Sequence, residues 1–365
     1  MTRRLFFTLL VALLCLSGAR NARAQSGAQG AQQIASLGDL KLQNGDAIRD
    51  FRIGYRTFGT LNSDKSNAIL WPTWLGGRTE DLVPFVGPGR VVDTTKYFVI
   101  LVDSIGNGLT TSPSNSKAQR WMSFPKFTIR DMVESERRLL TEVLQIKHLH
   151  AVMGVSMGGM QAFEWAVAYP DLMDEAIPML GSPQSTSFDK LLWTVEIDVV
   201  ELDPAWNHGH PTGSMDRGLR AAEEIDSMNL FTPEYRVKQT AASEFGPFVE
   251  KLRQNAGGDA GTASDFIRQR EAIIAFDLPK EFGATMEQAA RRLRAKLLVI
   301  VAGQDHMVNP APAVRFASAI GAPVVTVDSP CGHESFRCVS VGPTVASFLD
   351  DPSSAKTLTF DDPNP

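Results

Sequence analysis

Cysteine is scarce in this 365-residue sequence, and several marks of large protein classes are missing. With three cysteines, the chain can form at most one intramolecular disulfide. Its only long hydrophobic run, from Leu5 to Leu16, is about twelve residues long, too short to cross a bilayer as a helix. Internal repeats are absent, which excludes a repeat architecture.

An excess of positive charge is also lacking. The formal net charge is -5, from 36 Lys and Arg against 41 Asp and Glu. Four of the arginines lie within residues 1–24, so a chain without this segment keeps 32 basic residues and has a net charge of -9. We therefore expect neither nucleic acid nor an anionic membrane surface as a partner.

The first 24 residues have the three parts of a secretory signal peptide. Arg3 and Arg4 precede the hydrophobic run, and Ala22-Arg-Ala24 follows it. We expect cleavage after Ala24 and a secreted or periplasmic protein without membrane attachment. A membrane anchor is the alternative, and a lipid at Cys15 is disfavoured because Leu14 stands where lipoprotein signals have a small residue.

Two cysteines, Cys331 and Cys338, remain after such a cleavage. In an oxidising compartment a pair this close favours a disulfide, which would bracket His333. Two reduced thiols in a packed loop are the alternative.

Short runs of aliphatic and β-branched residues alternate with segments of helical periodicity, which is the pattern of a parallel sheet with flanking helices. One helix is expected after Thr128, with Asp131 completing a variant of the capping box. Between about residues 187 and 294 no strand pattern of comparable strength occurs. The expected strands are residues 67–71, 97–102, 149–153, 176–180, 297–302 and 324–327.

The segment Gly154-Val-Ser-Met-Gly158 lies between an expected strand and a helical pattern that runs to Tyr169. A sharp strand-to-helix turn lifts a serine out of regular backbone hydrogen bonding, and its crowding requires small residues such as Gly154 and Gly158. The pattern predicts that Ser156 is a nucleophile.

An acid and a base follow downstream in a suitable order. Asp305 and His333 each come just after an expected strand, at the sheet edge where the carboxyl ends of parallel strands meet. The order Ser, Asp, His is that of α/β-hydrolases. Asp328 is the alternative acid, and the contexts of the other histidines are less suitable.

These patterns predict an α/β-hydrolase fold with a mostly parallel central sheet, flanking helices and a helical cap insertion. A signal peptide (1–24) and a flexible leader (25–38) precede the core, whose two parts (39–186 and 295–350) enclose the cap (187–294). A polar tail (351–365) ends the chain.

An oxyanion hole is expected beside Ser156. One donor would be the backbone N–H of Met157, and the other would come from the loop 72–77, with Leu75 favoured over Trp74. His208 and His210 lack an obvious third ligand, so we expect no metal site and no cofactor.

Several motifs resemble the homoserine O-acetyltransferase branch of the α/β-hydrolase superfamily. They are Phe127-Thr-Ile-Arg-Asp-Met132, Gly154-Val-Ser-Met-Gly-Gly-Met-Gln161 continuing through Ala166, and Asp203-Pro-Ala-Trp-Asn207. The resemblance implies that Ser156 carries the acyl group, that Asp305 and His333 complete a triad, and that Leu75 and Met157 form the oxyanion hole. It also allows a homodimer.

The chain departs from this family where the substrate would bind. The family has an arginine for the homoserine carboxylate where this chain has Glu223, and its Asp after the catalytic histidine is Glu334. A carboxylate facing a carboxylate is repulsive. We place Trp74, Glu223 and Glu334 among the candidate substrate contacts.

The sequence therefore predicts an exported serine hydrolase that cleaves a small-molecule carboxylic ester through an acyl-enzyme. An O-acyltransferase is the first alternative, and only in that case would acyl-CoA be a co-substrate. A non-catalytic binding module on the same fold is the second.

Overall fold

The computed structural model describes residues 29–361, so the expected signal peptide lies outside the described residues. Within this range, none of the helices is long and apolar enough to cross a membrane.

A ten-stranded sheet forms the centre of the described chain, in the order β1-β2-β4-β3-β5-β6-β8-β9-β10, with β7 beside β6. The pairs β1/β2 and β2/β4 are antiparallel, and the pairs from β3 to β10 are parallel. The strands are β1 (Gln33–Lys41), β2 (Ala47–Phe58), β3 (Ala68–Pro72), β4 (Phe98–Val102), β5 (Leu149–Val155), β6 (Met173–Met179), β7 (Lys296–Leu297), β8 (Val299–Ala302), β9 (Val324–Asp328) and β10 (Leu358–Asp361).

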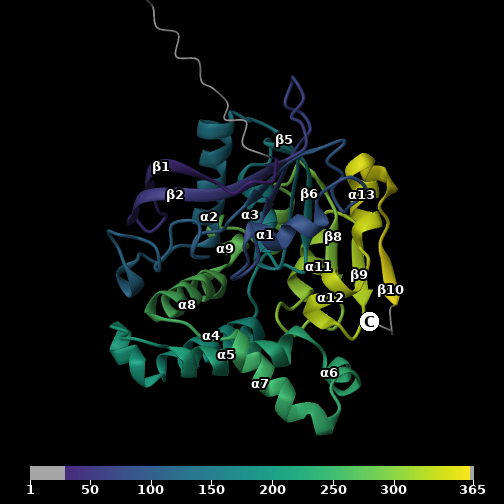
Figure 1. Cartoon of the computed structure of the whole chain (residues 1–365). Coiled ribbons are helices and arrows are strands. Elements are labelled where there is room, and N and C mark those ends of the chain that lie inside the picture. The colour runs from purple at the N-terminus through teal and green to yellow at the C-terminus, as the bar shows by residue number, and fades with distance from the viewer. Residues whose placement is uncertain (1–28, 362–365) are drawn as a thin grey trace, which may run out of the picture.

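Helices cover both faces of this sheet (Figure 1). One apolar core holds Met132, Phe163 and Phe316, and the other holds Leu82 and Phe348. The helices packed on the sheet are α1 (Thr79–Leu82), α2 (Ile129–Arg138), α3 (Met157–Ala168), α9 (Leu278–Glu281), α10 (Met286–Ala290), α11 (Ala311–Ser318), α12 (Ser335–Cys338) and α13 (Gly342–Asp350).

A helical cap lies beside the sheet domain, and Figure 1 shows α4 to α7 together at the bottom of the view. Its own small core includes Val200, Trp206 and Ile267. Helix α8 belongs to both parts, because Ile267 packs in the cap core and Ile273 in the sheet core. The cap helices are α4 (Ser187–Glu201), α5 (Asp216–Leu230), α6 (Pro233–Gln239), α7 (Phe245–Asn255) and α8 (Ala260–Ala275).

The expected fold class is confirmed, and each expected strand occurs within a few residues of its expected place. The capping box is also present at α2, where Thr128 Oγ1 accepts the Asp131 N–H at 3.1 Å. The cap differs from the expected 187–294 at its end, because α9 and α10 pack into the sheet core.

The predictions for two terminal segments are wrong in part. The expected flexible leader (25–38) is a strand from Gln33 onward, and the expected polar tail (351–365) contains β10. Irregular pairing near Gly38 interrupts the alternation of β1, so its sequence does not show a strand pattern. Both strands lie at the ends of the sheet order, where each is hydrogen-bonded to a neighbouring strand. The composition of the two segments alone does not predict that they are strands.

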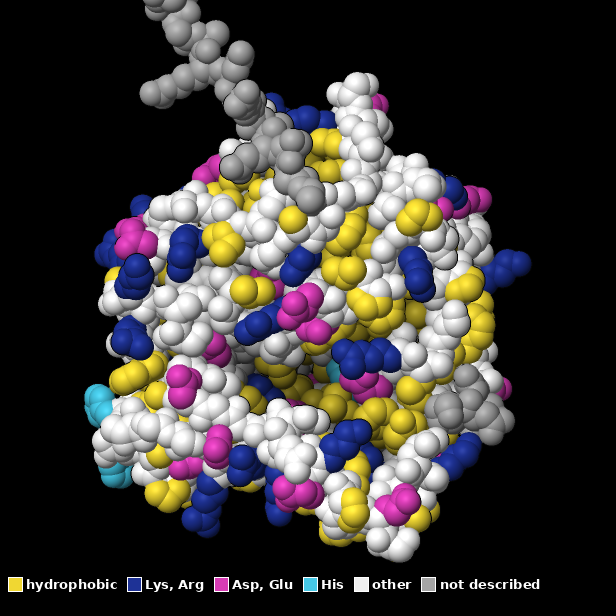
Figure 2. Space-filling model, viewed as in Figure 1, with side chains coloured by type: hydrophobic (Ala, Val, Ile, Leu, Met, Phe, Trp, Pro, Cys, Tyr) yellow, Lys and Arg dark blue, Asp and Glu magenta, His cyan; other side chains and the backbone are white. Residues whose placement is uncertain are grey.

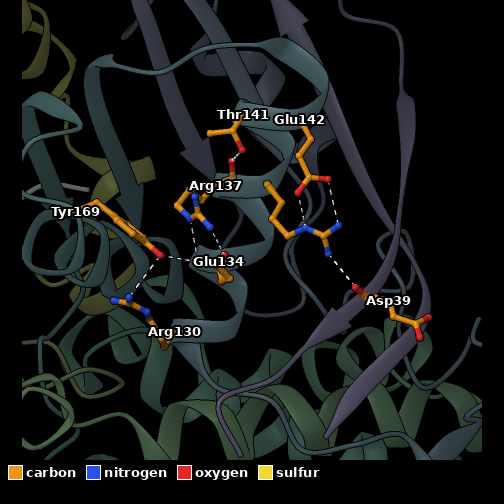
Figure 3. A network of polar contacts seen from close by, with 8 residues as sticks. Asp39, Arg130, Glu134, Arg137, Thr141, Glu142 and Tyr169 are labelled. Carbon is orange, nitrogen blue, oxygen red and sulfur yellow. Dashed lines mark hydrogen bonds and ion pairs between the residues drawn. The ribbon is translucent and has the colours of Figure 1, made fainter. Parts of the chain in front are cut away.

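A polar network attaches α2 to its neighbours (Figure 3). Glu134 of α2 accepts hydrogen bonds from Arg137 and from the hydroxyl of Tyr169, the residue that ends α3. Arg138 donates to the backbone carbonyls of Leu37 and Asp39 in β1. These contacts hold α2 against α3, which follows Ser156, and against the edge strand β1.

Candidate active site

Ser156 stands at a sharp turn between β5 and α3. Its φ of 57° and ψ of -122° are unusual for a residue with a side chain. A Cβ atom on Gly154 would lie 2.2 Å from the Gly158 carbonyl oxygen, and one on Gly158 would lie 2.6 Å from the Pro72 carbonyl oxygen. Only glycine fits at these two positions, as the sequence pattern predicts.

Ser156, His333 and Asp305 are joined by hydrogen bonds. His333 Nε2 lies 2.9 Å from Ser156 Oγ, and His333 Nδ1 lies 2.7 Å from Asp305 Oδ2. The other carboxylate oxygen of Asp305 accepts the N–H groups of Met307 and Val308 at 2.8 and 2.9 Å. These bonds fix the orientation of the carboxylate, which in turn fixes the imidazole.

Opposing effects act on the pKa of His333. Burial lowers it, but the adjacent Asp305 carboxylate and the hydrogen bond to it raise it, with a further contribution from Glu334 and Asp226. The net result is a pKa above the usual 6.5. When Nδ1 donates to Asp305, the neutral ring presents Nε2 as an acceptor toward the Ser156 hydroxyl.

The alternative candidates lie apart from Ser156. Asp328 is exposed and accepts a hydrogen bond from Gln304. His148 pairs with Asp174 at 2.8 Å. His208 and His210 are in a turn of the cap, and residues 29–361 contain no group of three His, Cys, Asp or Glu side chains arranged to hold a metal ion.

A disulfide joins Cys331 to Cys338, whose Cα atoms are 6.4 Å apart. His333 lies within the loop that it closes, and so do the cavity residues Phe336 and Arg337. The covalent link limits the conformations of the segment that carries the imidazole.

The two expected oxyanion donors flank Ser156 in different elements. Met157 is the first residue of α3, so the helix has no carbonyl partner for its N–H. Leu75 lies in a loop fixed by two neighbours: the Gly77 N–H donates to the Trp74 carbonyl at 3.0 Å, and the Gly76 N–H donates to Gln269 at 2.8 Å. Gln269, on α8, is therefore a positioning residue for this loop.

A cavity of about 430 Å³ opens beside Ser156 and His333 between the sheet domain and the cap. Figure 2 shows a hollow in this face, with hydrophobic, acidic and basic side chains around it. Its lining is mixed in polarity and comes from both domains: Trp74, Leu75, Gly76, Gly77, Asp81, Val155, Ser156, Trp193, Glu223, Asp226, Leu230, Phe266, Arg270, Met307, His333, Glu334, Phe336 and Arg337.

The cap side of this cavity carries a charged cluster. Arg270 of α8 donates to Glu196 at 2.5 Å and to Asp226 at 2.9 Å. Burial is the main cause that raises the pKa of Glu196 to about 8, while the Arg270 charge opposes this effect and the Asp226 charge adds to it. Burial and Asp226 also raise the pKa of Glu223.

The core side of the cavity carries the other two expected contact residues. Glu334 pairs with Arg337 at 3.4 Å, and the Arg337 guanidinium lies 5.1 Å from the centre of the Trp74 ring. All three expected contacts, Trp74, Glu223 and Glu334, therefore line the same cavity as Ser156.

Sequence reasoning missed several residues at the site, and four of them lie on its cap side: Trp193, Asp226, Gln269 and Arg270. All four are on cap helices, whose rotation relative to the sheet is set by tertiary packing. The sequence contains a partial indication of the residues on α8. Arg268-Gln-Arg270 is a polar run in the middle of a helix that also supplies Ile267 and Ile273 to apolar cores.

Comparisons with known proteins agree with this geometry. Residues 77–208 match the family model of the alpha/beta hydrolase fold. A probable esterase of Corynebacterium glutamicum is 37% identical over 291 residues, which cover 76% of this chain and 82% of that protein. A homoserine O-acetyltransferase of Geotalea daltonii is 30% identical over 349 residues, which cover 85% and 95%.

A solved structure is also similar. The crystal structure of an acetylester hydrolase from Corynebacterium glutamicum has a TM-score of 0.81 and 27% identity, and the match covers 88% of this chain and 96% of that one. The chain is thus an enzyme of the esterase or acyltransferase kind. It belongs to the homoserine O-acetyltransferase-like family of the α/β-hydrolase superfamily.

Proposed function

We propose that the protein is an exported serine esterase that hydrolyses a small carboxylic ester through an acyl-enzyme. The observation that carries this proposal is the hydrogen-bonded chain from Ser156 Oγ through His333 to Asp305, at the wall of a cavity large enough for a small ester.

In this mechanism Ser156 Oγ attacks the ester carbonyl carbon while His333 Nε2 accepts the hydroxyl proton. The tetrahedral intermediate then expels the alcohol, which takes that proton from His333, and the acyl group stays on Ser156. Water attacks the acyl-enzyme with His333 again as base, and the carboxylic acid leaves. Asp305 keeps the imidazole in the required tautomer and stabilises its protonated form.

The negative charge on the carbonyl oxygen needs fixed donors. The N–H groups of Met157 and Leu75 are the proposed pair, and losing one such donor typically costs about 3 to 4 kcal/mol in the barrier. The proposed chemistry uses the side chains and backbone of this chain, with no cofactor.

Export is part of the proposal. The composition of residues 1–24 supports it, and the disulfide between Cys331 and Cys338 is in keeping with an oxidising compartment. An exported enzyme would have water in excess and little acyl-CoA, which favours hydrolysis over transfer.

Acyl transfer is the second candidate, because homoserine O-acetyltransferases are among the relatives. Transfer and hydrolysis share the acyl-enzyme and differ in the acceptor. Glu223 argues against homoserine, since its carboxylate would repel that of the acceptor.

The test is the release of nitrophenol from p-nitrophenyl acetate by residues 25–365, with and without homoserine. We expect turnover that homoserine does not change. Ser156→Ala should remove turnover and labelling by a fluorophosphonate. Acceleration by homoserine with O-acetylhomoserine as product would establish transfer, whereas full turnover by Ser156→Ala would refute the mechanism. A wild-type protein that is neither active nor labelled would favour a binding module.

A further inference from the structure

The charges along the active-site cavity do not balance. Four carboxylates line it, Asp81, Glu223, Asp226 and Glu334, against the two guanidiniums of Arg270 and Arg337. A ligand enclosed by these walls would meet a negative potential unless the basic side chains were free to compensate.

Both arginines already pair with carboxylates. Arg270 is 4% exposed and donates to both Glu196 and Asp226. Its guanidinium also lies 3.2 Å from the centre of the Phe266 ring. Arg337 pairs with Glu334 and lies over the ring of Trp74. An anionic ligand would compete with these carboxylates for the two guanidiniums.

Glu223 differs from the other three carboxylates of the cavity in its contacts. It is partly buried on α5 and lines the cavity, yet it forms no hydrogen bond or ion pair with another residue of the described chain. Asp81 differs, because it accepts the Arg78 N–H in the cap of α1. A partly desolvated carboxylate without a partner is costly, and a cation supplied by the ligand would offset that cost.

A second polar group also lacks a partner at the same wall. Trp193 of α4 is 2% exposed and lines the cavity, and its indole Nε1 has no hydrogen-bond partner among the described residues. This N–H has almost no accessible surface of its own, so the group that the cap wall offers to a positively charged ligand is the carboxylate of Glu223.

We propose that the cavity selects esters whose alcohol or acyl part carries an ammonium group, and that Glu223 is the residue that selects them. The inference rests on the proposed esterase function and adds the substrate class to it. The positive charge lies near Glu223 while the ester carbonyl lies at Ser156.

The test uses pairs of esters that have the same shape and differ in charge alone. On the alcohol side the pair is 2-(trimethylammonio)ethyl acetate and 3,3-dimethylbutyl acetate. On the acyl side it is ethyl 4-(trimethylammonio)butanoate and ethyl 5,5-dimethylhexanoate. For each pair, acid release gives the ratio of kcat/KM for the cation to that for the neutral ester.

We expect the ratio of at least one pair to fall about tenfold in Glu223→Gln, because the variant keeps the size of the side chain and removes its charge. Glu224→Gln is the matched control, since Glu224 lies on the same helix but pairs with Arg253 at 2.6 Å outside the cavity lining. Its ratios should stay within about twofold of those of the wild type.

A measurement on the wild type is independent of whether the variants fold. Choline should inhibit cleavage of 3,3-dimethylbutyl acetate more strongly than 3,3-dimethylbutan-1-ol does if the cation binds on the alcohol side. If Glu223→Gln leaves the ratios of both ester pairs unchanged while cleavage still depends on Ser156, the inference is overturned and the esterase function stands. Failure to cleave any of the four esters, with no fluorophosphonate labelling, would instead count against the esterase function itself.

Discussion

Replacing Gln269 with leucine tests whether the cap positions the oxyanion-hole loop. Gln269 is 1% exposed, accepts the Gly76 N–H at 2.8 Å and donates to the Ile105 carbonyl at 2.9 Å. Leucine has a similar size and can make neither bond. Leu75, which precedes Gly76 and is the proposed oxyanion donor, would then lose a contact that supports its loop.

Both a stability effect and a rate effect follow. Each of the two lost hydrogen bonds is worth about 1 kcal/mol, and leaving the buried Ile105 carbonyl without its donor adds about 1 to 3 kcal/mol, so the free energy of unfolding should fall by about 3 to 5 kcal/mol. A displacement of about 1 Å at a reacting group can cost about 100-fold in rate, so we expect kcat to fall by about 10- to 100-fold with a smaller change in KM.

Two further variants separate these effects. Gln269→Glu keeps an acceptor for Gly76 and loses the donor to Ile105, so it should lose stability but keep more of kcat than Gln269→Leu. Gln254→Leu, at an exposed position on α7, is the control and should change neither quantity. The assays are p-nitrophenyl acetate turnover and urea unfolding. A Gln269→Leu protein with reduced stability and a kcat within about twofold of wild type would refute the positioning role.

Two other predictions follow from the charged groups. Because His333 must be neutral to accept a proton and its pKa is raised, kcat/KM should fall as the pH is lowered, with a midpoint above 6.5. Glu334→Gln removes a charge that raises this pKa, so the midpoint of the profile should move to lower pH. A midpoint that stays in place would contradict the assignment of His333 as the base. Arg130 pairs at 2.8 Å with Glu164, whose side chain is fully buried, so Arg130→Met should lower the free energy of unfolding by about 2 to 3 kcal/mol in urea. Arg315→Met, which breaks an exposed pair, should cause no measurable loss, and equal effects of the two variants would refute the role of burial.

The sequence predicts the part of the fold that is encoded locally. Most of the strands from β3 to β9 are largely aliphatic runs buried on both faces, such as Val299–Ala302, so they can be recognised by themselves. Ser156, Asp305 and His333 follow from the same logic, because each comes shortly after such a strand. Strands β1, β2 and β10 were missed because their pairing partners, not their composition, make them strands.

The cap side of the site depends on contacts distant in sequence. Gln269 reaches Gly76 across 193 positions, and Arg270 reaches Glu196 across 74. The sequence predicts a helical cap, but it does not predict which side of α8 faces the cavity, because both sides of this helix are buried. The roles of Trp193, Asp226 and Arg270 therefore required the packing of α4, α5 and α8.

Helix α8 has a consequence for any attempt to change the substrate by exchanging caps between relatives. The same helix supplies Arg270 to the cavity beside Ser156 and Gln269 to the loop that carries the proposed oxyanion donor Leu75. A transplanted cap would therefore replace the substrate wall and, at the same time, one of the supports of the catalytic loop. A chimera that loses all activity would say nothing about substrate fit unless a glutamine had been kept at position 269.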